Sequence, residues 1–122
     1  LQKIKPDAAI IVIGPSDMAT KIDGDFVSYP YLENVRDALK KAAFETGSGF
    51  WDLYEVMGGK NSMTSWVEST PPLAGKDYVH FNRRGVNRVA ALFYNALWED
   101  HGEWVKKNLS TNKIGKIEKN TI

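Results

Sequence analysis

Two residues late in the chain, Asp77 and His80, have the types and the spacing needed for proton transfer. An aspartate shortly before a histidine can fold back in a tight turn, so that its carboxylate bonds one nitrogen of the imidazole. That bond fixes the tautomer and leaves the other nitrogen free to accept a proton, as a general base must. The same spacing also suits the start of a helix, where both side chains would bond backbone groups instead. Spacing alone leaves both interpretations open.

A second cluster, Gly14-Pro15-Ser16-Asp17, directly follows an apolar segment that ends at Ile13. A glycine turn at the end of a strand can bring backbone and side-chain donors close to a substrate. The hydroxyl of Ser16 could then stabilise the negative charge that develops on an oxygen during acyl transfer. The alternative is an ordinary turn in which the carboxylate of Asp17 caps backbone amides of the loop.

Three residues are candidates for contact with a substrate. Asp17 lies in the turn just described, while Ser62 and Trp66 lie in a second polar segment ahead of Asp77. A loop tryptophan can stack on a sugar ring, and Trp66 is a candidate for this role. Nothing around Ser62 resembles the sharp turn that exposes a nucleophile, so we expect it to be structural or to face the substrate. The remaining tryptophans are expected to pack inside the protein: Trp51, Trp98 and Trp104.

Apolar patterns predict four elements that would position these residues. Residues 8–13 form a short apolar run rich in β-branched side chains, as a strand buried on both faces does, and residues 50–57 are a second candidate strand. Apolar side chains recur every three or four residues from 32 to 43 and from 86 to 97, which predicts two amphipathic helices. Gly47 is expected to end the first helix. Asn82 is expected to cap the second, which could continue to residue 109.

The resulting order is strand, helix, strand, helix, with long loops over residues 14–29 and 58–80. This alternation predicts an α/β fold with a parallel sheet. In such sheets ligands bind beyond the carboxyl ends of the strands, and both loops leave from those ends. We therefore expect the two polar clusters to contribute to one site.

Composition limits the classes of protein that need to be considered. The chain has 122 residues, of which 43% are hydrophobic and 25% charged, as is typical of one globular domain. A formal net charge of +1 gives no electrostatic reason to expect a nucleic-acid partner. There are no cysteines, which excludes disulfides, thiolate metal sites and a cysteine nucleophile. We expect no membrane span, because no apolar run approaches the ~20 residues that one needs.

Together, the two clusters resemble motifs of the SGNH, or GDSL-like, esterases and lipases. The segment IIVIGPSDM resembles the third conserved block of that family, in which a strand ends in Gly-x-Asn-Asp. The segment DYVHFNRRGVNRVAALFYNAL resembles the fifth block, in which Asp-x-x-His precedes the last helix. Residues 58–63 and Trp66 resemble a segment of the bacterial, carbohydrate-directed branch, the peptidoglycan O-acetylesterase-like proteins.

The resemblance implies a three-layer α/β/α hydrolase fold of the flavodoxin-like type. It also implies hydrolysis of a carboxylic ester, such as an acetyl ester on a carbohydrate, through an acyl-enzyme. His80 would be the general base, Asp77 would orient it, and Ser16 would stand where the family has its oxyanion-hole asparagine. A hydroxyl there donates one rotatable hydrogen, whereas the amide donates a fixed pair. The substrate would be a glycan or small-molecule ester, and the reaction would need no cofactor or metal. The protein would lie in the periplasm or outside the cell.

One feature of the family is absent from the chain. The family's nucleophilic serine lies in a Gly-Asp-Ser motif, which the 122 residues do not contain. We therefore expect residues 1–109 to be the C-terminal part of a hydrolase domain, inactive alone, and residues 110–122 to be a polar lysine-rich tail. Such a part would self-associate or pair with the missing part, because a sheet edge and an apolar face would be exposed. The alternative is a non-catalytic module that binds a glycan or a protein.

Overall fold

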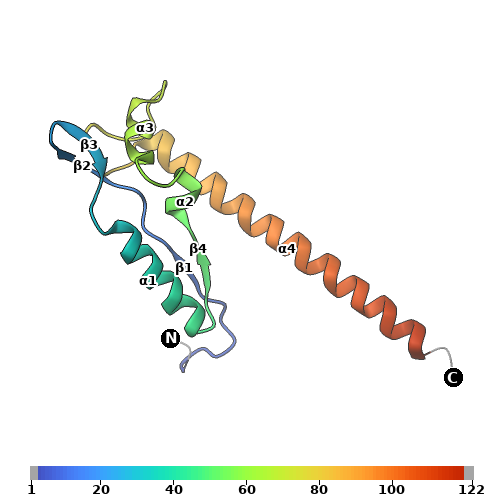
Figure 1. Cartoon of the computed structure of the whole chain (residues 1–122). Coiled ribbons are helices and arrows are strands. Elements are labelled where there is room, and N and C mark those ends of the chain that lie inside the picture. Colours follow the sequence, from blue (N-terminus) through green and yellow to red (C-terminus); the bar gives the residue numbers. More distant parts are fainter. Residues whose placement is uncertain (1–2, 120–122) are drawn as a thin grey trace. The chain divides into compact units, whose positions relative to one another are not determined.

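The computed structural model describes residues 3–119 of the chain, with the side chains of residues 3–110 (Figure 1). The chain divides into two compact units, Leu1–Val89 and Ala90–Ile122. The first unit holds the described strands and the polar clusters noted in the sequence. The second unit continues the last helix, α4, which spans Arg83–Lys119.

The first unit contains a two-stranded parallel sheet. Strand β1 (Ile11–Ile13) pairs with β4 (Gly49–Trp51). The N–H of Gly14 donates to the carbonyl of Trp51 at 2.8 Å, which extends the pairing by one residue. Helix α1 (Leu32–Glu45) lies between the two strands in the chain and packs against both (Figure 1). This arrangement confirms the predicted α/β fold with a parallel sheet.

Helix α1 ends as the sequence predicts. Gly47 has φ +70°, a left-handed conformation that glycine adopts without the steric penalty of a Cβ atom. Its N–H donates to the carbonyl of Phe44, and the N–H of Ser48 donates to the carbonyl of Ala43. These bonds satisfy carbonyl groups that a helix otherwise leaves free at its end.

The first predicted loop, residues 14–29, contains an antiparallel hairpin that the apolar pattern does not reveal. Strand β2 (Ala19–Ile22) pairs with β3 (Asp25–Ser28) through a two-residue turn. Both turn residues have positive φ, 52° at Asp23 and 99° at Gly24, as the favoured turns of two-residue hairpins require. The Asp-Gly pair is the available sequence signal, because the flanking residues lack a clear alternation of apolar and polar side chains.

Two short helices occupy segments for which the sequence predicts a strand and a loop. The predicted strand over residues 50–57 is correct only as far as Trp51. The carboxylate of Asp52 then accepts a backbone N–H at 3.3 Å and caps α2 (Leu53–Met57). Helix α3 (Ser62–Glu68) lies within the second predicted loop. A short apolar run does not by itself distinguish a strand from a buried helix.

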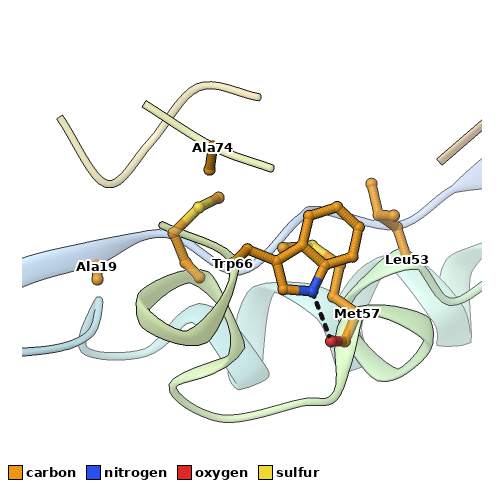
Figure 2. Close-up of a cluster of buried hydrophobic side chains, with 6 residues drawn as sticks. Ala19, Leu53, Met57, Trp66 and Ala74 are labelled. Carbon is orange, nitrogen blue, oxygen red and sulfur yellow. Dashed lines mark hydrogen bonds between the residues drawn. The ribbon is translucent and has the colours of Figure 1, made fainter. Parts of the chain in front are cut away.

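The apolar core of the first unit joins the hairpin, α2, α3 and the segment that precedes α4 (Figure 2). Its buried members are Ala19, Leu53, Met57, Met63, Trp66 and Ala74. Met63 is completely buried, and the indole N–H of Trp66 donates to the carbonyl of Met57 at 3.0 Å (Figure 2). The core therefore connects the elements to which the Asp77–His80 segment is attached.

Helix α4 begins where the sequence predicts. The side-chain oxygen of Asn82 accepts the backbone N–H groups of Arg84 at 2.9 Å and Gly85 at 3.1 Å. The helix then continues to Lys119, beyond the expected end near residue 109. The predicted lysine-rich tail is residues 110–122, and its side chains from residue 111 onward lie outside the described part of the chain. No helix in the described part of the chain is long and apolar enough to span a bilayer.

Two tryptophans that the sequence predicts to pack are instead exposed on α4. Trp98 is 66% exposed and Trp104 is 61% exposed. The rings of Tyr94, Trp98, His101 and Trp104 follow one another along the helix, with neighbouring centroids 6.1 to 6.3 Å apart. Helical spacing brings these rings close together, but it does not determine whether another part of a protein covers them.

Candidate active site

Asp77 and His80 are in direct contact. Oδ2 of Asp77 lies 2.8 Å from Nδ1 of His80. The other carboxylate oxygen, Oδ1, accepts the backbone N–H groups of Val79 and His80, each at 3.1 Å. The first interpretation of the spacing therefore describes the contact, while the helix-start alternative holds only in that one oxygen of Asp77 binds backbone N–H groups, because the imidazole binds Asp77 and α4 begins at Arg83.

The charge state of Asp77 determines which tautomer His80 adopts. The hydrogen bond from the His80 side chain, followed by the two backbone N–H bonds, lowers the pKa of Asp77 from 3.8 to about 2. The carboxylate is therefore ionised at neutral pH and can only accept hydrogen bonds. Nδ1 of His80 must then carry the proton, which leaves the lone pair of Nε2 available in the neutral ring.

The free nitrogen of His80 is open to solvent. The side chain is 81% exposed, and Nε2 has no hydrogen-bond partner within the described residues. An imidazole that is fixed at one nitrogen and free at the other can accept a proton from a neighbouring hydroxyl group. In the part of the chain that the structure describes, no cluster of three His, Asp or Glu side chains could hold a metal ion.

Tyr78 anchors the turn to the β2–β3 hairpin. Its φ of +59° is rare for a bulky residue, and it allows the chain to reverse between Asp77 and His80. The carbonyl of Tyr78 accepts the N–H of Ala19 at 2.9 Å. Its ring stacks on that of Phe26, with the centroids 3.6 Å apart. The turn is therefore held by one backbone bond and one ring contact to the hairpin.

The other side of the turn is attached to the start of α4. The N–H of Gly75 donates to the carbonyl of His80 at 2.8 Å, and the N–H of Asn82 donates to the carbonyl of Leu73 at 3.1 Å. The carbonyl of Leu73 also lies so close to Gly85 that a Cβ atom at 85 would be only 1.9 Å from its oxygen. Glycine at position 85 is thus required by packing.

The cluster at the end of β1 makes no bond with the histidine. Ser16 is half-buried, and no hydrogen bond joins it to His80 in the described part of the chain. Its role as an oxyanion donor stays a prediction. Gly14 is buried against Phe50, where a Cβ atom would lie 2.7 Å from Cζ of the ring. The glycine after β1 is therefore in close contact with Phe50 of β4, and a side chain at position 14 would force that ring to shift.

Asp17 and Ser62, which the sequence predicts to face a substrate, are buried. Asp17 is fully buried, and its Oδ2 accepts the N–H of Met63 at 2.8 Å, in the first turn of α3. Its Oδ1 and the hydroxyl of Ser62 have no hydrogen-bond partner in the described residues. Their burial corrects the predicted substrate contact. The alternative, in which Asp17 bonds backbone amides, describes its position better.

Trp66 also lies inside the protein, at 8% exposure. Helix α3 turns its indole toward the core (Figure 2). The centre of the indole ring lies 5.4 Å from that of the Phe81 ring. Stacking on a sugar requires an exposed ring face. The predicted sugar contact of Trp66 is therefore wrong, because the segment forms a helix and buries the ring.

The fold is similar to a solved structure of a peptidoglycan O-acetylesterase in action. The two share a TM-score of 0.72 and 27% sequence identity, and the match covers 80% of this chain. The chain has the fold of part of an SGNH-type hydrolase. This SGNH-type fold confirms the resemblance noted in the sequence, although the chain spans only 28% of the length of the esterase. No family model and no curated protein sequence matches the chain.

Two residues that position the Asp77–His80 pair of this SGNH-type fold were not identified from the sequence. In the sequence, Tyr78 is only a variable position of the Asp-x-x-His motif. Neither its positive φ nor its stacking on the hairpin has a sequence signal. Gly85 does have a sequence signal, because glycine in the first turn of a helix is unfavourable unless a close contact requires it.

Proposed function

We propose that the chain supplies the general base of an SGNH-type ester hydrolase, with His80 as the base and Asp77 as the residue that orients it. The observation that carries this proposal is the 2.8 Å contact between Oδ2 of Asp77 and Nδ1 of His80, combined with the exposure of the histidine. The similarity to an esterase structure supports the same class of reaction.

The proposed reaction uses a serine hydroxyl supplied by sequence outside these 122 residues. Nε2 of His80 accepts the hydroxyl proton as the serine oxygen attacks the ester carbonyl carbon, and Asp77 stabilises the imidazolium that forms. The departing alcohol takes that proton, and an acyl-enzyme remains. A water molecule, deprotonated by the same nitrogen, then attacks the acyl carbon. The bond to the serine oxygen breaks, the imidazolium returns its proton to that oxygen, and the carboxylic acid leaves. Ser16 is the proposed donor to the oxyanion.

For the substrate we propose an acyl ester, most simply an acetyl ester, on a carbohydrate. The similar solved structure is that of a peptidoglycan O-acetylesterase, which supports this choice of acyl group and alcohol. An ester on a bacterial cell-wall glycan is met outside the cytoplasm, so the same substrate would place the protein in the periplasm or outside the cell.

The test compares the full encoded protein with two variants, because the described chain has two histidines. Hydrolysis of 4-nitrophenyl acetate is measured for the wild type, His80→Ala and His101→Ala. Removing the base is expected to lower kcat by about 10⁴-fold. His101→Ala, a change on α4, is expected to leave kcat unchanged. Equal activity of the wild type and His80→Ala would exclude His80 as the base.

A second candidate function is a non-catalytic module that binds a glycan or a protein. The observation that favours it is the absence of a Gly-Asp-Ser motif from the 122 residues. This function predicts that the full encoded protein binds a glycan but does not hydrolyse the aryl ester. It also predicts that His80→Ala changes neither property.

A further inference from the structure

A small polar cavity lies in the first unit, where β3 leads into α1. Its volume is about 150 Å³. The side chains that matter for its chemistry are Tyr29, Tyr31, Glu33, Asn34, Tyr54 and Lys60. Sites for drug-sized ligands are usually about 300–1,000 Å³, so this cavity suits a single ring or a similar small group. It shares no residue with the turn that holds Asp77 and His80.

Tyr31 is an unusual residue for its position at the mouth of this cavity. It is the N-cap of α1, where a short polar side chain is favoured, yet it makes no side-chain cap bond. It has φ +65°, which is unfavourable for a bulky residue, and it is 80% exposed. Packing and helix capping therefore do not account for a tyrosine here, whereas contact of its exposed ring with a ligand does.

Two of the side chains that line the cavity are hydrogen-bonded to each other: Tyr54, which is buried, and Glu33, which is exposed. The hydroxyl of Tyr54 donates to Oε1 of Glu33 at 2.8 Å. Burial, followed by the hydrogen bond to Glu33, raises the pKa of Tyr54 to about 12, so the phenol keeps its proton. The guanidinium of Arg36 lies over the Tyr54 ring, 5.1 Å from its centre, in a cation–π contact. The carboxylate of Glu33 is thereby fixed as an acceptor for hydroxyl groups of a ligand.

Lys60 is brought to the cavity by the turn that precedes α3. The N–H of Ser28 donates to Oδ1 of Asn61 at 2.9 Å, and the N–H of Asn61 donates to the hydroxyl of Ser28 at 2.7 Å. This reciprocal pair fixes the turn to the end of β3. The cavity thus combines a cation, a carboxylate, an amide and three tyrosine rings, a set that matches an uncharged ligand with many hydroxyl and amide groups.

We propose that this cavity binds one sugar residue of a glycan, an N-acetylated hexosamine being the ring whose hydroxyl and amide groups match its donors and acceptors. The exposed rings of Tyr29 and Tyr31 would stack on the sugar. Glu33, Asn34 and Lys60 would bond its polar groups.

The cavity and the Asp77–His80 turn are connected through the hairpin. Ala19 of β2 pairs with Ser28 of β3, which lines the cavity, and the N–H of Ala19 donates to the carbonyl of Tyr78. Two strand spacings, about 10 Å in total, therefore separate the backbone of the turn from that of Ser28. A glycan chain with its ester at His80 could thus place a neighbouring sugar in the cavity. That connection rests on the proposed function, whereas binding of the sugar itself does not.

The experiment measures binding without turnover, so that it is independent of any esterase activity. The full encoded protein, labelled with ¹⁵N, is titrated with triacetylchitotriose and followed by two-dimensional amide NMR. The amides of residues 29–34 and of Lys60 are expected to shift. Tyr31→Asn removes the ring while placing a residue that tolerates positive φ and caps a helix well, so the variant is expected to stay folded.

Tyr31→Asn is expected to weaken binding at least tenfold. The matched control is Tyr94→Asn, which removes an exposed tyrosine of α4 and should leave binding unchanged. Absence of shifts at about 10 mM of the trisaccharide, a concentration above the millimolar Kd of a weak complex, would overturn the proposal. Shifts centred away from the cavity, or equal binding by Tyr31→Asn, would overturn it too. Sugar binding by both the wild type and His80→Ala would support the cavity as a sugar site. If neither of these proteins had esterase activity, the proposed hydrolase would be rejected while the sugar site would stand.

Discussion

Asp77 binds His80 twice, through the imidazole Nδ1 at 2.8 Å and through the backbone N–H at 3.1 Å. The two contacts use different oxygens of one carboxylate. The same short turn therefore closes the backbone and orients the imidazole. Asp77→Asn is expected to keep at most one of these contacts, since an amide has only one oxygen with which to accept hydrogen bonds.

The carboxyl group of Asp77 is expected to titrate near pH 2 in the folded protein. Because this pKa lies below the ordinary value of 3.8, its contacts stabilise the fold above that value and lose their effect as the pH falls through about 2. A carboxyl-carbon NMR titration measures the midpoint. In His80→Ala it should rise toward 3.8, since the first cause of the lowered pKa is removed. A wild-type midpoint near 3.8 would contradict the hydrogen-bonded turn.

Gly85→Ala is expected to destabilise the fold strongly. A Cβ atom at position 85 would lie 1.9 Å from the backbone oxygen of Leu73, and backbone cannot move aside as a flexible side chain can. Overpacking of this kind costs about 1–3 kcal/mol or more. The control is Gly102→Ala, where nothing lies within 4 Å and the change should stabilise the helix by up to about 1 kcal/mol. Thermal unfolding followed by circular dichroism separates the two, and similar melting temperatures would refute the contact.

Asp17→Ala is expected to destabilise the first unit by roughly 1–3 kcal/mol, because it leaves the buried N–H of Met63 without its acceptor. Asp17→Asn keeps the volume and an acceptor oxygen, so its cost should be smaller. The control is Asp7→Ala, at an exposed position. Urea denaturation gives the three free energies of unfolding. If Asp17→Ala were no more costly than Asp7→Ala, the carboxylate would not hold α3.

The 122-residue chain is expected to self-associate. Ile11 and Ile13 of β1 and Val35 of α1 are exposed, and β1 has one paired neighbour among the described strands. Stable proteins cover such edges and apolar faces. Light scattering at high dilution should give a mass above that of one copy. A monomeric mass would show that this surface is tolerated in water.

Much of the parallel sheet and the Asp77–His80 turn could be predicted from the sequence, because each has a local signal. A β-branched run ended by glycine marks β1, and the spacing of apolar residues marks α1. Asn82 marks the start of α4, since asparagine is a favoured N-cap residue and an apolar helical pattern follows it. The Asp-x-x-His spacing allows the contact that the structure contains.

Other features depend on contacts that local patterns do not encode. The indole of Trp66 could be placed only by knowing that its segment is helical and packs on α2. The burial of Asp17 likewise depends on α3, which begins 45 residues later in the chain, at Ser62. The hairpin did have a local signal, Asp23-Gly24, but its strands carry few apolar residues in alternation.

The central claim is that His80 is the base that activates a serine, and a fluorophosphonate probe tests it most directly, because only an activated serine reacts. The full encoded protein is labelled alongside His80→Ala and His101→Ala, and mass spectrometry measures the rate and the site. We predict labelling of one serine in the wild type and in His101→Ala, slowed by at least about 10³-fold in His80→Ala. Equal labelling rates in all three proteins, or no labelling of the wild type, would contradict the claim.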